Sequence, residues 1–393
     1  MSKKTSVARR MMHIRPFYVM DLLARARALE AQGRSVIHME IGEPDFITPA
    51  PIVEAGQRAL SAGQTHYTPA LGLPALRQRI AASYHLNYGV VVEPSRVLVT
   101  PGASGALQLV MSVLINPGDV VLMADPGYPC NRHFVRLVEG IPTSVPVGPE
   151  TGYQLTADLL DAAWTPQTRA VLVASPSNPT GTLLSVEALH EIYQVVKSRG
   201  GVLVVDEIYQ GLIYDGSGCS ALSIADDIFV INSFSKFYGM TGWRLGWVVV
   251  PAGYVEPMDR LAQNIFLAAS TLSQHAALEA FSDEVAAILE DRRQEYMQRR
   301  DYLLPALRSL GFDIPVVPGG AFYLYAGSSR LTPDSFKFAQ SLLNEAGVAV
   351  TPGRDFGSHR PEQHIRFAYT TCLANLEEGV GRIRRFLGHG VAP

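Results

Sequence analysis

Six short apolar runs, each followed by a turn-forming segment and then by a helical pattern, constrain the fold more than any other feature of this chain. They occupy residues 96–100, 120–124, 169–175, 201–207, 228–233 and 245–251. Continuous apolar runs of this length are typical of strands that are buried on both faces, and the helical patterns between them predict crossover connections. We therefore expect an α/β fold in which a mostly parallel central sheet lies between helices.

The segments on either side of these runs have a different pattern of apolar and polar residues. Residues 20–33 predict a helix that ends at a glycine, and a long charged helix follows the last apolar run. Near the C-terminus, "GGAFYLYA" and "HIRFAYT" alternate as strands with one exposed face do, among further helical patterns. We expect three parts, which are an N-terminal arm with part of a small domain (1–45), a large domain (46–295) and a smaller α+β domain (296–393).

Composition excludes several classes of protein. Of 393 residues, 47% are hydrophobic and 18% charged, as in a soluble globular protein. The net charge of −3 produces no positive electrostatic potential that would attract nucleic acid or an anionic membrane, so we expect neither as a partner. Three cysteines without CxxC spacing indicate neither a disulfide framework nor a metal site, and they favour a reducing, cytoplasmic location. No apolar stretch approaches the ~20 residues of a membrane span.

Polar and turn-forming residues collect directly after five of the apolar runs. Three of the runs lead into "PGASGAL", "DPGYP" and "SPSNPTG", and the other two end in Asp206 to Tyr209 and in Ser233 to Lys236. Because open parallel sheets bind ligands at the carboxyl ends of their strands, we expect these segments to converge on one site.

Two features of these segments suggest a phosphate and a cationic ring. "PGASGAL" opens a helix, whose free amides attract anions, and Ser233 and Arg244 could add a hydroxyl and a bidentate guanidinium. Asp206 follows an apolar run and, if buried, needs a cationic or donor partner such as a protonated pyridine nitrogen. Two alternatives stay open on sequence alone, namely that Asp206 caps a helix and that Lys236 is merely solvated.

The stretch "SFSKFYGMTGWRLG", with an S-x-S-K sequence and an arginine eight residues after the lysine, resembles the lysine motif of the class I aminotransferases. These are pyridoxal-phosphate enzymes of fold type I. The resemblance extends from "RPFYVMDLLARA" and "IGEPDFITP" through "YTPALGLPALR", "SPSNPTG" and "VVDEIY" to "PGGAFYLY" and "HIRFAYT". It implies that the chain moves the amino group of an L-amino acid to a 2-oxo acid in a ping-pong cycle.

The resemblance also implies roles for residues around the cofactor ring. Lys236 would hold pyridoxal 5'-phosphate as a Schiff base and later move the substrate proton. Asp206 would keep the ring nitrogen protonated, and Tyr128 would stack on the ring. Asn178 and Tyr209 would bind the phenolic oxygen.

Further roles implied by the resemblance concern the phosphate, the substrate and a second subunit. The phosphate would be held by Gly102, Ala103, Ser104, Ser233 and Arg244, with Ser235 as a weaker candidate. Tyr67 would reach the phosphate of a neighbouring subunit, which implies a homodimer with shared active sites. Arg366 would bind the substrate α-carboxylate, assisted by Asn178 and the backbone at Gly42.

The substrate side chain is constrained less. A subgroup that uses dicarboxylates has a lysine where Ser104 stands, so an acidic preference is in doubt, although Arg132 or Arg15 could compensate. An aromatic or aliphatic pocket could instead be lined by Phe17, Tyr18, Phe322 and Tyr323.

Other functions compete with this interpretation. A carbon–sulfur lyase of the same fold would use the same cofactor contacts. A nicotinamide dehydrogenase would explain "VLVTPGASGAL" and Asp125, but the glycine spacing departs from GxGxxG and Lys236 is left without a role. A non-catalytic regulator would need a DNA-binding module, for which the residues before "RPFYVM" are too few.

Overall fold

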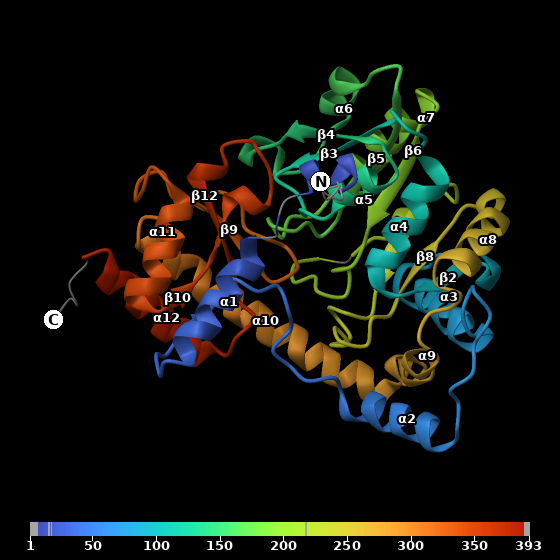
Figure 1. The fold of residues 1–393 in the computed structure, drawn as a ribbon, viewed down its shortest axis with the longest axis horizontal. Coiled ribbons are helices and arrows are strands. Elements are labelled where there is room, and N and C mark those ends of the chain that lie inside the picture. The colour runs from blue at the N-terminus through green and yellow to red at the C-terminus, as the bar shows by residue number, and fades with distance from the viewer. Residues whose placement is uncertain (1–6, 15, 17, 217, 389–393) are drawn as a thin grey trace, which may run out of the picture.

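The computed structural model describes residues 7–14, 16, 18–216 and 218–388. A seven-stranded sheet forms the centre of the large domain, with the strand order β2-β8-β7-β6-β5-β3-β4 (Figure 1). The strands are β2 (Val97–Thr100), β3 (Val120–Asp125), β4 (Ile141–Pro146), β5 (Thr168–Ala174), β6 (Val202–Asp206), β7 (Phe229–Ser233) and β8 (Gly246–Val249). Strand β8 is antiparallel to β2 and β7, and the other pairs are parallel. The mostly parallel α/β sheet is therefore confirmed.

One strand of this sheet was not predicted. Strand β4 lies at the edge, next to β3 alone, and of its six residues only Val145 is buried. It also contains Pro142 and Pro146, which edge strands tolerate because one side of their backbone makes no ladder. Its sequence lacks the continuous apolar run by which the six other strands were recognised.

Alternate residues of the sheet point into two apolar cores. In β2, for example, Val97 and Val99 belong to one core and Leu98 to the other. One face is covered by α2 (Ala50–Ser61), α3 (Pro74–Tyr88), α6 (Ala157–Ala163), α7 (Val186–Ser198) and α9 (Thr271–Ala277). The opposite face is covered by α4 (Gly102–Leu114), α5 (Asn131–Leu137) and α8 (Val255–Ile265). The sheet thus lies between two helical layers, as a parallel sheet must.

A single long helix joins the two domains. Helix α10 (Asp283–Ser309) runs from the large domain into the small domain (Figure 1). Its residues Val285 and Leu289 pack in the large domain, whereas Leu303 and Leu307 pack in the core of the small domain. The domain division that we propose between residues 295 and 296 therefore falls inside a continuous helix.

The small domain is built on a three-stranded antiparallel sheet with the order β11-β12-β9. Its elements are β9 (Tyr323–Gly327), α11 (Ser335–Ser341), β11 (Thr351–Pro352), β12 (His364–Ala368) and α12 (Leu373–Phe386). The expectation that β9 and β12 have an exposed face is wrong, because each has four of its five residues buried. One face of β9 packs in the small-domain core, while Tyr323 and Tyr325 meet Tyr209 and Tyr153 of the large domain.

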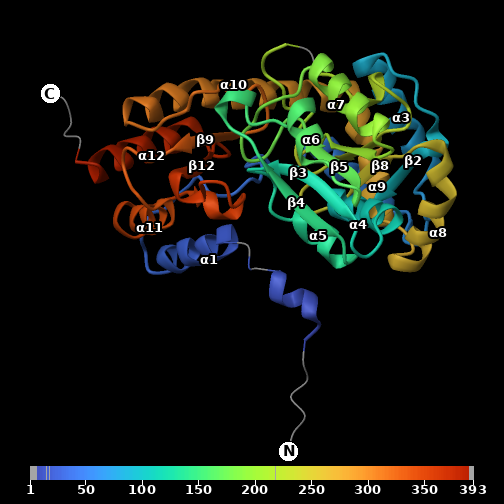
Figure 2. The ribbon, with the colours of Figure 1, turned by 90° about the horizontal axis from the view of Figure 1, so that it is seen from above.

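The N-terminal part of the chain packs on the small domain. Strand β1 (Ile37–His38) pairs in parallel with β10 (Val348–Ala349), and α1 (Tyr18–Glu30) lies against the same domain (Figure 2). The short helix η1 (Arg9–His13) is exposed and is linked to α5 through Arg136, whose Nη1 donates to His13 O at 2.8 Å. Among the described helices, none combines the length and apolar character needed to cross a membrane.

Candidate active site

A cavity of about 380 Å³ opens at the carboxyl ends of the large-domain strands, beside the small domain. Most of the predicted site residues line it, and these are Gly42, Ala103, Ser104, Tyr128, Asn178, Asp206, Tyr209, Ser233, Ser235, Lys236, Arg244 and Arg366. Gly102 lies directly behind them, against Arg244. Tyr67 is 84% exposed and lines a separate depression, so within one chain it is not part of the cavity.

Lys236 lies in the turn that follows β7, and its Nζ donates a hydrogen bond to Gly42 O at 2.6 Å. Burial lowers the pKa of Lys236 to about 8, although the nearby Glu43 carboxylate opposes that effect. The alternative of a solvated surface lysine is therefore wrong. A buried amine with this pKa is partly neutral near pH 7–8, which is the form that attacks a carbonyl carbon.

Asp206 ends β6 with its carboxyl group buried in the cavity wall. Burial raises the pKa of Asp206 to about 6, while the hydrogen bond from the backbone N–H of Ile208 to Oδ1 at 3.1 Å lowers it. Turns rather than a helix follow β6, so the capping alternative is wrong. The carboxyl group is therefore free to interact with a cation in the cavity. Such a cation would stabilise the ionised carboxylate, which burial alone disfavours.

Donors for an anion gather where α4 begins. Gly102 has a φ of 70°, a backbone conformation that favours glycine, and a Cβ there would lie 2.7 Å from Arg244 Nη2 and displace the guanidinium. Arg244 has a φ of 53° and also donates from Nη1 to Thr241 O at 3.0 Å. The first amides of α4 and this guanidinium form one cationic end of the cavity.

The two serines after β7 are hydrogen-bonded to each other. Ser233 Oγ accepts the backbone N–H of Ser235, and it lies 3.0 Å from Ser235 Oγ and 3.1 Å from Leu245 O. Because Ser233 donates its own hydrogen within this cluster, the hydroxyl hydrogen of Ser235 is the one left for a ligand among the described residues. The structure therefore favours Ser235 over Ser233 as a donor, which reverses the expected ranking.

Arg366 forms the other cationic end of the cavity, from strand β12. Its Nη1 donates to Asn178 Oδ1 at 3.0 Å, and its Nη2 donates to Glu40 O at 2.5 Å. The guanidinium also lies over the rings of Tyr323, at 4.3 Å, and Phe356, at 4.8 Å. Its Nε has no hydrogen-bond partner among the described residues, although it is buried. A buried guanidinium with a spare donor is suited to binding a carboxylate.

Two tyrosines in the lining of the cavity contact each other. The hydroxyl groups of Tyr209 and Tyr323 lie 2.8 Å apart. A Cβ at Gly42 would stand 1.9 Å from Tyr323 Oη, so only glycine fits between the tyrosine and the lysine.

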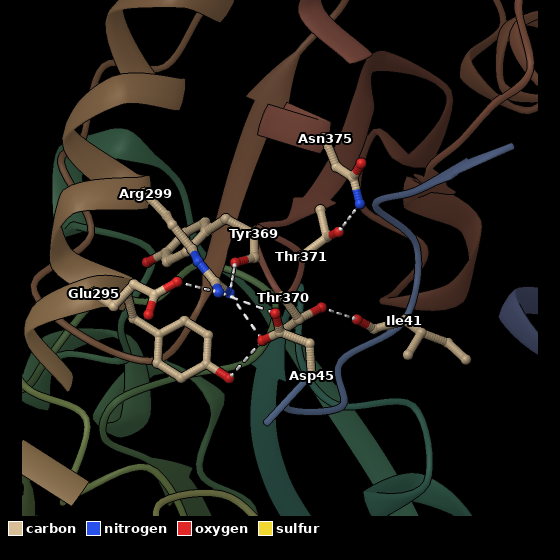
Figure 3. A network of polar contacts seen from close by, with 9 residues as sticks. Ile41, Asp45, Glu295, Arg299, Tyr369, Thr370, Thr371 and Asn375 are labelled. Carbon is tan, nitrogen blue, oxygen red and sulfur yellow. Dashed lines mark hydrogen bonds and ion pairs between the residues drawn. The ribbon is translucent and has the colours of Figure 1, made fainter. Parts of the chain in front are cut away.

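The segment that carries Gly42 is held on both sides of that residue (Figure 3). Thr370 Oγ1 donates to Ile41 O at 2.8 Å. Arg299 binds both carboxylate oxygens of Asp45, at 2.8 and 2.9 Å, although the arginine side chain is only 2% exposed. The carbonyl that faces Lys236 is therefore fixed by groups of the small domain and of α10.

The residues expected to surround a substrate side chain are only partly in place. Tyr323 lines the cavity, but Tyr18 does not and packs edge-on against Phe336 at 5.8 Å. Phe322 does not line it either, although its ring centre lies 6.0 Å from Lys236 Nζ. Arg132 does not line it either, since Nη2 donates to Asp355 O at 3.0 Å and the Nε group to Pro129 O. Arg15 and Phe17 lie outside the described residues.

Several lining residues were missed by the sequence analysis. These are Val19, Met20, Ile41, Glu43, Leu107, Ala174, Pro176, Ile208, Thr241 and Gly242, together with Phe356 behind Arg366. The motifs around Ile41 and Thr241 had already been noted, and their neighbours could have been included on that ground. Val19 and Phe356 carry no local signal, since their position depends on how distant segments pack.

Residues 34–383 match the protein family described as aminotransferase class I and II. The chain belongs to this family. A valine–pyruvate aminotransferase of Mycobacterium tuberculosis is 39% identical over 375 residues, which cover 95% of this chain and 96% of the relative. A (5-formylfuran-3-yl)methyl phosphate transaminase of Methanocaldococcus jannaschii is 37% identical, with 97% and 99% covered.

The fold of this aminotransferase is shared with solved structures. A crystal structure of an aminotransferase from M. tuberculosis has a TM-score of 0.95 at 38% identity and covers 98% of this chain and 100% of the other. The expected fold type I and the transfer of amino groups are confirmed, and neither the dehydrogenase nor the lyase alternative is favoured.

Proposed function

We propose that this aminotransferase binds pyridoxal 5'-phosphate in the 380 Å³ cavity and uses Lys236 to move an amino group from an L-amino acid to a 2-oxo acid. The observation that carries the proposal is the position of Lys236. A buried amine with a pKa of about 8 lies in one cavity with a buried carboxyl group and two cationic ends.

The residues present fit the parts of that cofactor. A phosphate monoester suits the amides of Ala103 and Ser104, the guanidinium of Arg244 and the Ser235 hydroxyl. A protonated pyridine nitrogen suits Asp206, whose burial requires a partner. A phenolic oxygen suits Tyr209 and the Asn178 amide, because Asn178 uses its Oδ1 for Arg366 and retains its NH₂ donors. Tyr128 is available to cover the ring face.

When bound, the cofactor supplies an electron-accepting ring that stabilises the negative charge left when the substrate loses its α-proton. Lys236 would supply the amine that takes this proton and later returns it. Asp206 would hold the proton on the ring nitrogen, and Tyr209 and Tyr323 line the same cavity as the amine.

We propose that Arg366 binds the α-carboxylate of both substrates, assisted by Asn178 and the backbone at Gly42. Its stacking on Tyr323 and Phe356 fixes the plane of the guanidinium. The guanidinium would therefore bind the two carboxylate oxygens of the substrate in a single orientation. This orientation also decides which bond of the α-carbon faces Lys236.

Substrates with uncharged side chains suit the cavity better than dicarboxylates. Among the described lining residues the cationic side chains are Lys236, Arg244 and Arg366, and each already has a proposed role. Glu43 adds a carboxylate to the lining, while Val19 and Ile41 add apolar surface. An acidic side chain would therefore be repelled and left unpaired, which is costly in a desolvated site.

We propose a homodimer in which Tyr67 of the partner subunit contributes to each site, since this tyrosine is 84% exposed in the single chain. Sedimentation should give twice the chain mass, and Tyr67→Phe should weaken cofactor binding without dissociating the dimer. A monomer with full activity would contradict this proposal.

The three cysteines are free, and we propose a cytoplasmic location.

The function is tested by recording near-visible absorbance after adding pyridoxal phosphate and then single amino acids. We expect a band that is lost with selected uncharged amino acids and restored by 2-oxo acids. Lys236→Ala should show no conversion, whereas Lys197→Ala, which alters a lysine that is 57% exposed, should behave as wild type. Release of ammonia and a 2-oxo acid with one amino acid alone would instead establish elimination.

A further inference from the structure

Asp125, at the end of β3, contacts a loop of the small domain that the proposed mechanism does not use. We call residues 355–359 the clasp loop. Asp125 is 2% exposed, and its Oδ2 accepts hydrogen bonds from Ser358 N at 2.8 Å, Ser358 Oγ at 2.9 Å and His359 N at 3.3 Å. A buried carboxylate with three donors on one oxygen makes a strong, directional contact.

The other carboxylate oxygen of Asp125 lies so close to the clasp loop that position 357 must be glycine. A Cβ at Gly357 would lie 1.6 Å from Asp125 Oδ1, so no other residue could pack there without displacing the carboxylate. This close approach shows that the loop backbone rests directly on the side chain. The contact crosses the domain boundary, because Asp125 belongs to the large domain and the clasp loop to the small domain.

Two neighbouring contacts reinforce the same junction. The backbone N–H of Gly127 donates to Phe356 O at 2.9 Å. Arg132, which was a candidate for contact with an acidic substrate, donates from Nη2 to Asp355 O at 3.0 Å. The segment from Asp125 to Arg132 therefore holds the clasp loop at several points, and Tyr128, the proposed cover of the cofactor ring, lies within that segment.

The clasp loop in turn positions both parts of the substrate site. The Asp355 carboxylate accepts the backbone N–H groups of Tyr18 at 2.9 Å and Val19 at 2.8 Å, and so fixes the first turn of α1, which places Val19 in the cavity wall. Phe356 lies under the guanidinium of Arg366 at 4.8 Å. Displacement of this loop would move the side-chain wall and the carboxylate-binding arginine together.

We propose that Asp125 is a positioning residue for substrate binding, which latches the clasp loop to the large domain and thereby sets Arg366 and the α1 wall relative to the cofactor. This inference rests on the proposed function for its kinetic consequence. The contact between Asp125 and the clasp loop, which we call the latch, does not depend on catalysis and can be measured without turnover.

The test compares holoenzymes of Asp125→Ala, Asp125→Asn and Asp119→Ala. Asp119 precedes the opposite end of β3, and its carboxylate accepts hydrogen bonds only from Asn116 among the described residues, at 2.8 and 3.2 Å, so it is the matched control. Four quantities are measured: KM and kcat for an amino acid and its 2-oxo acid partner, affinity for the unreactive carboxylate 3-phenylpropionate, and hydrogen exchange of residues 356–359.

For Asp125→Ala we expect KM for both substrates to rise about tenfold or more, with kcat within about threefold, because ground-state and transition-state binding are lost together. Affinity for 3-phenylpropionate should fall by a similar factor, and the amides of Ser358 and His359 should exchange faster. Asp125→Asn should show the same changes to a smaller degree, and Asp119→Ala should show none.

Several results would overturn the proposal. One is unchanged KM and unchanged exchange in both Asp125 variants, and another is an equal rise in KM for Asp119→Ala. If Asp125→Ala does not fold, Asp125→Asn decides by the same criteria. Should the enzyme prove inactive in transamination, the proposed function fails, whereas faster exchange with weaker 3-phenylpropionate binding would still support the latch.

Discussion

Lys236 Nζ and Gly42 O lie 2.6 Å apart, and this hydrogen bond joins the turn after β7 to the segment that follows β1. The lysine belongs to the large domain, whereas the segment around Gly42 is held through Ile41 by Thr370 and through Asp45 by Arg299. The reactive amine is thus positioned by both domains. Small changes in their relative placement should alter its chemistry.

The first prediction concerns the pH dependence of cofactor attachment. Burial lowers the pKa of Lys236 to about 8, so the neutral amine predominates above that pH and falls about tenfold per unit below it. The rate at which apoenzyme captures pyridoxal phosphate should rise with pH and level off above about 8. Stopped-flow absorbance measures it, and a rate that still climbs between pH 9 and 10 would show that the lysine is not perturbed.

The second prediction concerns Asp206. Asp206→Asn keeps the volume of the side chain but removes the charge that holds a proton on the ring nitrogen, so kcat should fall by about 10² or more. Cofactor binding should persist, because the phosphate contacts are untouched. Asp226→Asn, a change on the loop before β7, serves as the control, and equal kcat values for both variants would contradict the role of Asp206.

The third prediction concerns Arg366. Arg366→Lys loses the planar fork and its stacking on Tyr323, so kcat/KM should fall about 10²-fold or more for the amino acid and the 2-oxo acid alike. Arg354→Lys alters an exposed arginine that stacks on Phe336 at 5.2 Å and should leave both values unchanged. A loss confined to one of the two substrates would argue against α-carboxylate binding.

The fourth prediction concerns stability. Asp45→Ala removes the bidentate partner of Arg299 and should lower the free energy of unfolding by about 2–4 kcal/mol, because that arginine is buried. Glu54→Ala breaks a pair with Arg58 whose side chains are 65% and 64% exposed, and it should change the value by less than about 0.5 kcal/mol. Urea unfolding of the two variants gives the comparison, and similar values would refute a structural role for Asp45.

The sequence predicted the sheet where strands are buried on both faces, since continuous apolar runs mark β2, β3 and β5 to β8 directly. It failed at β4, because an edge strand buries too little surface to impose such a pattern. It also misjudged β9 and β12, whose alternation conceals that Tyr323 and Tyr325 are covered by the other domain. Coverage by a distant segment leaves no trace in the periodicity of one strand.

The candidate site shows the same division. Lys236, Asp206 and Asn178 were predictable because each belongs to a motif that ends a strand, and strand ends in parallel sheets converge. The clasp loop was not predictable, because Asp355 and Phe356 are held by contacts with residues more than 200 positions away. Arg132 was misinterpreted for the same reason, as its partner is a backbone carbonyl that no motif specifies.

The most direct test of the central proposal locates the covalent bond between chain and cofactor. Holoenzyme is reduced with borohydride, digested and analysed by mass spectrometry, with Lys236→Ala treated in parallel. Our account predicts that the peptide containing Lys236 carries one reduced cofactor and that the variant carries none at any lysine. A cofactor on another lysine, or an unmodified Lys236 in a protein that still transaminates, would contradict it.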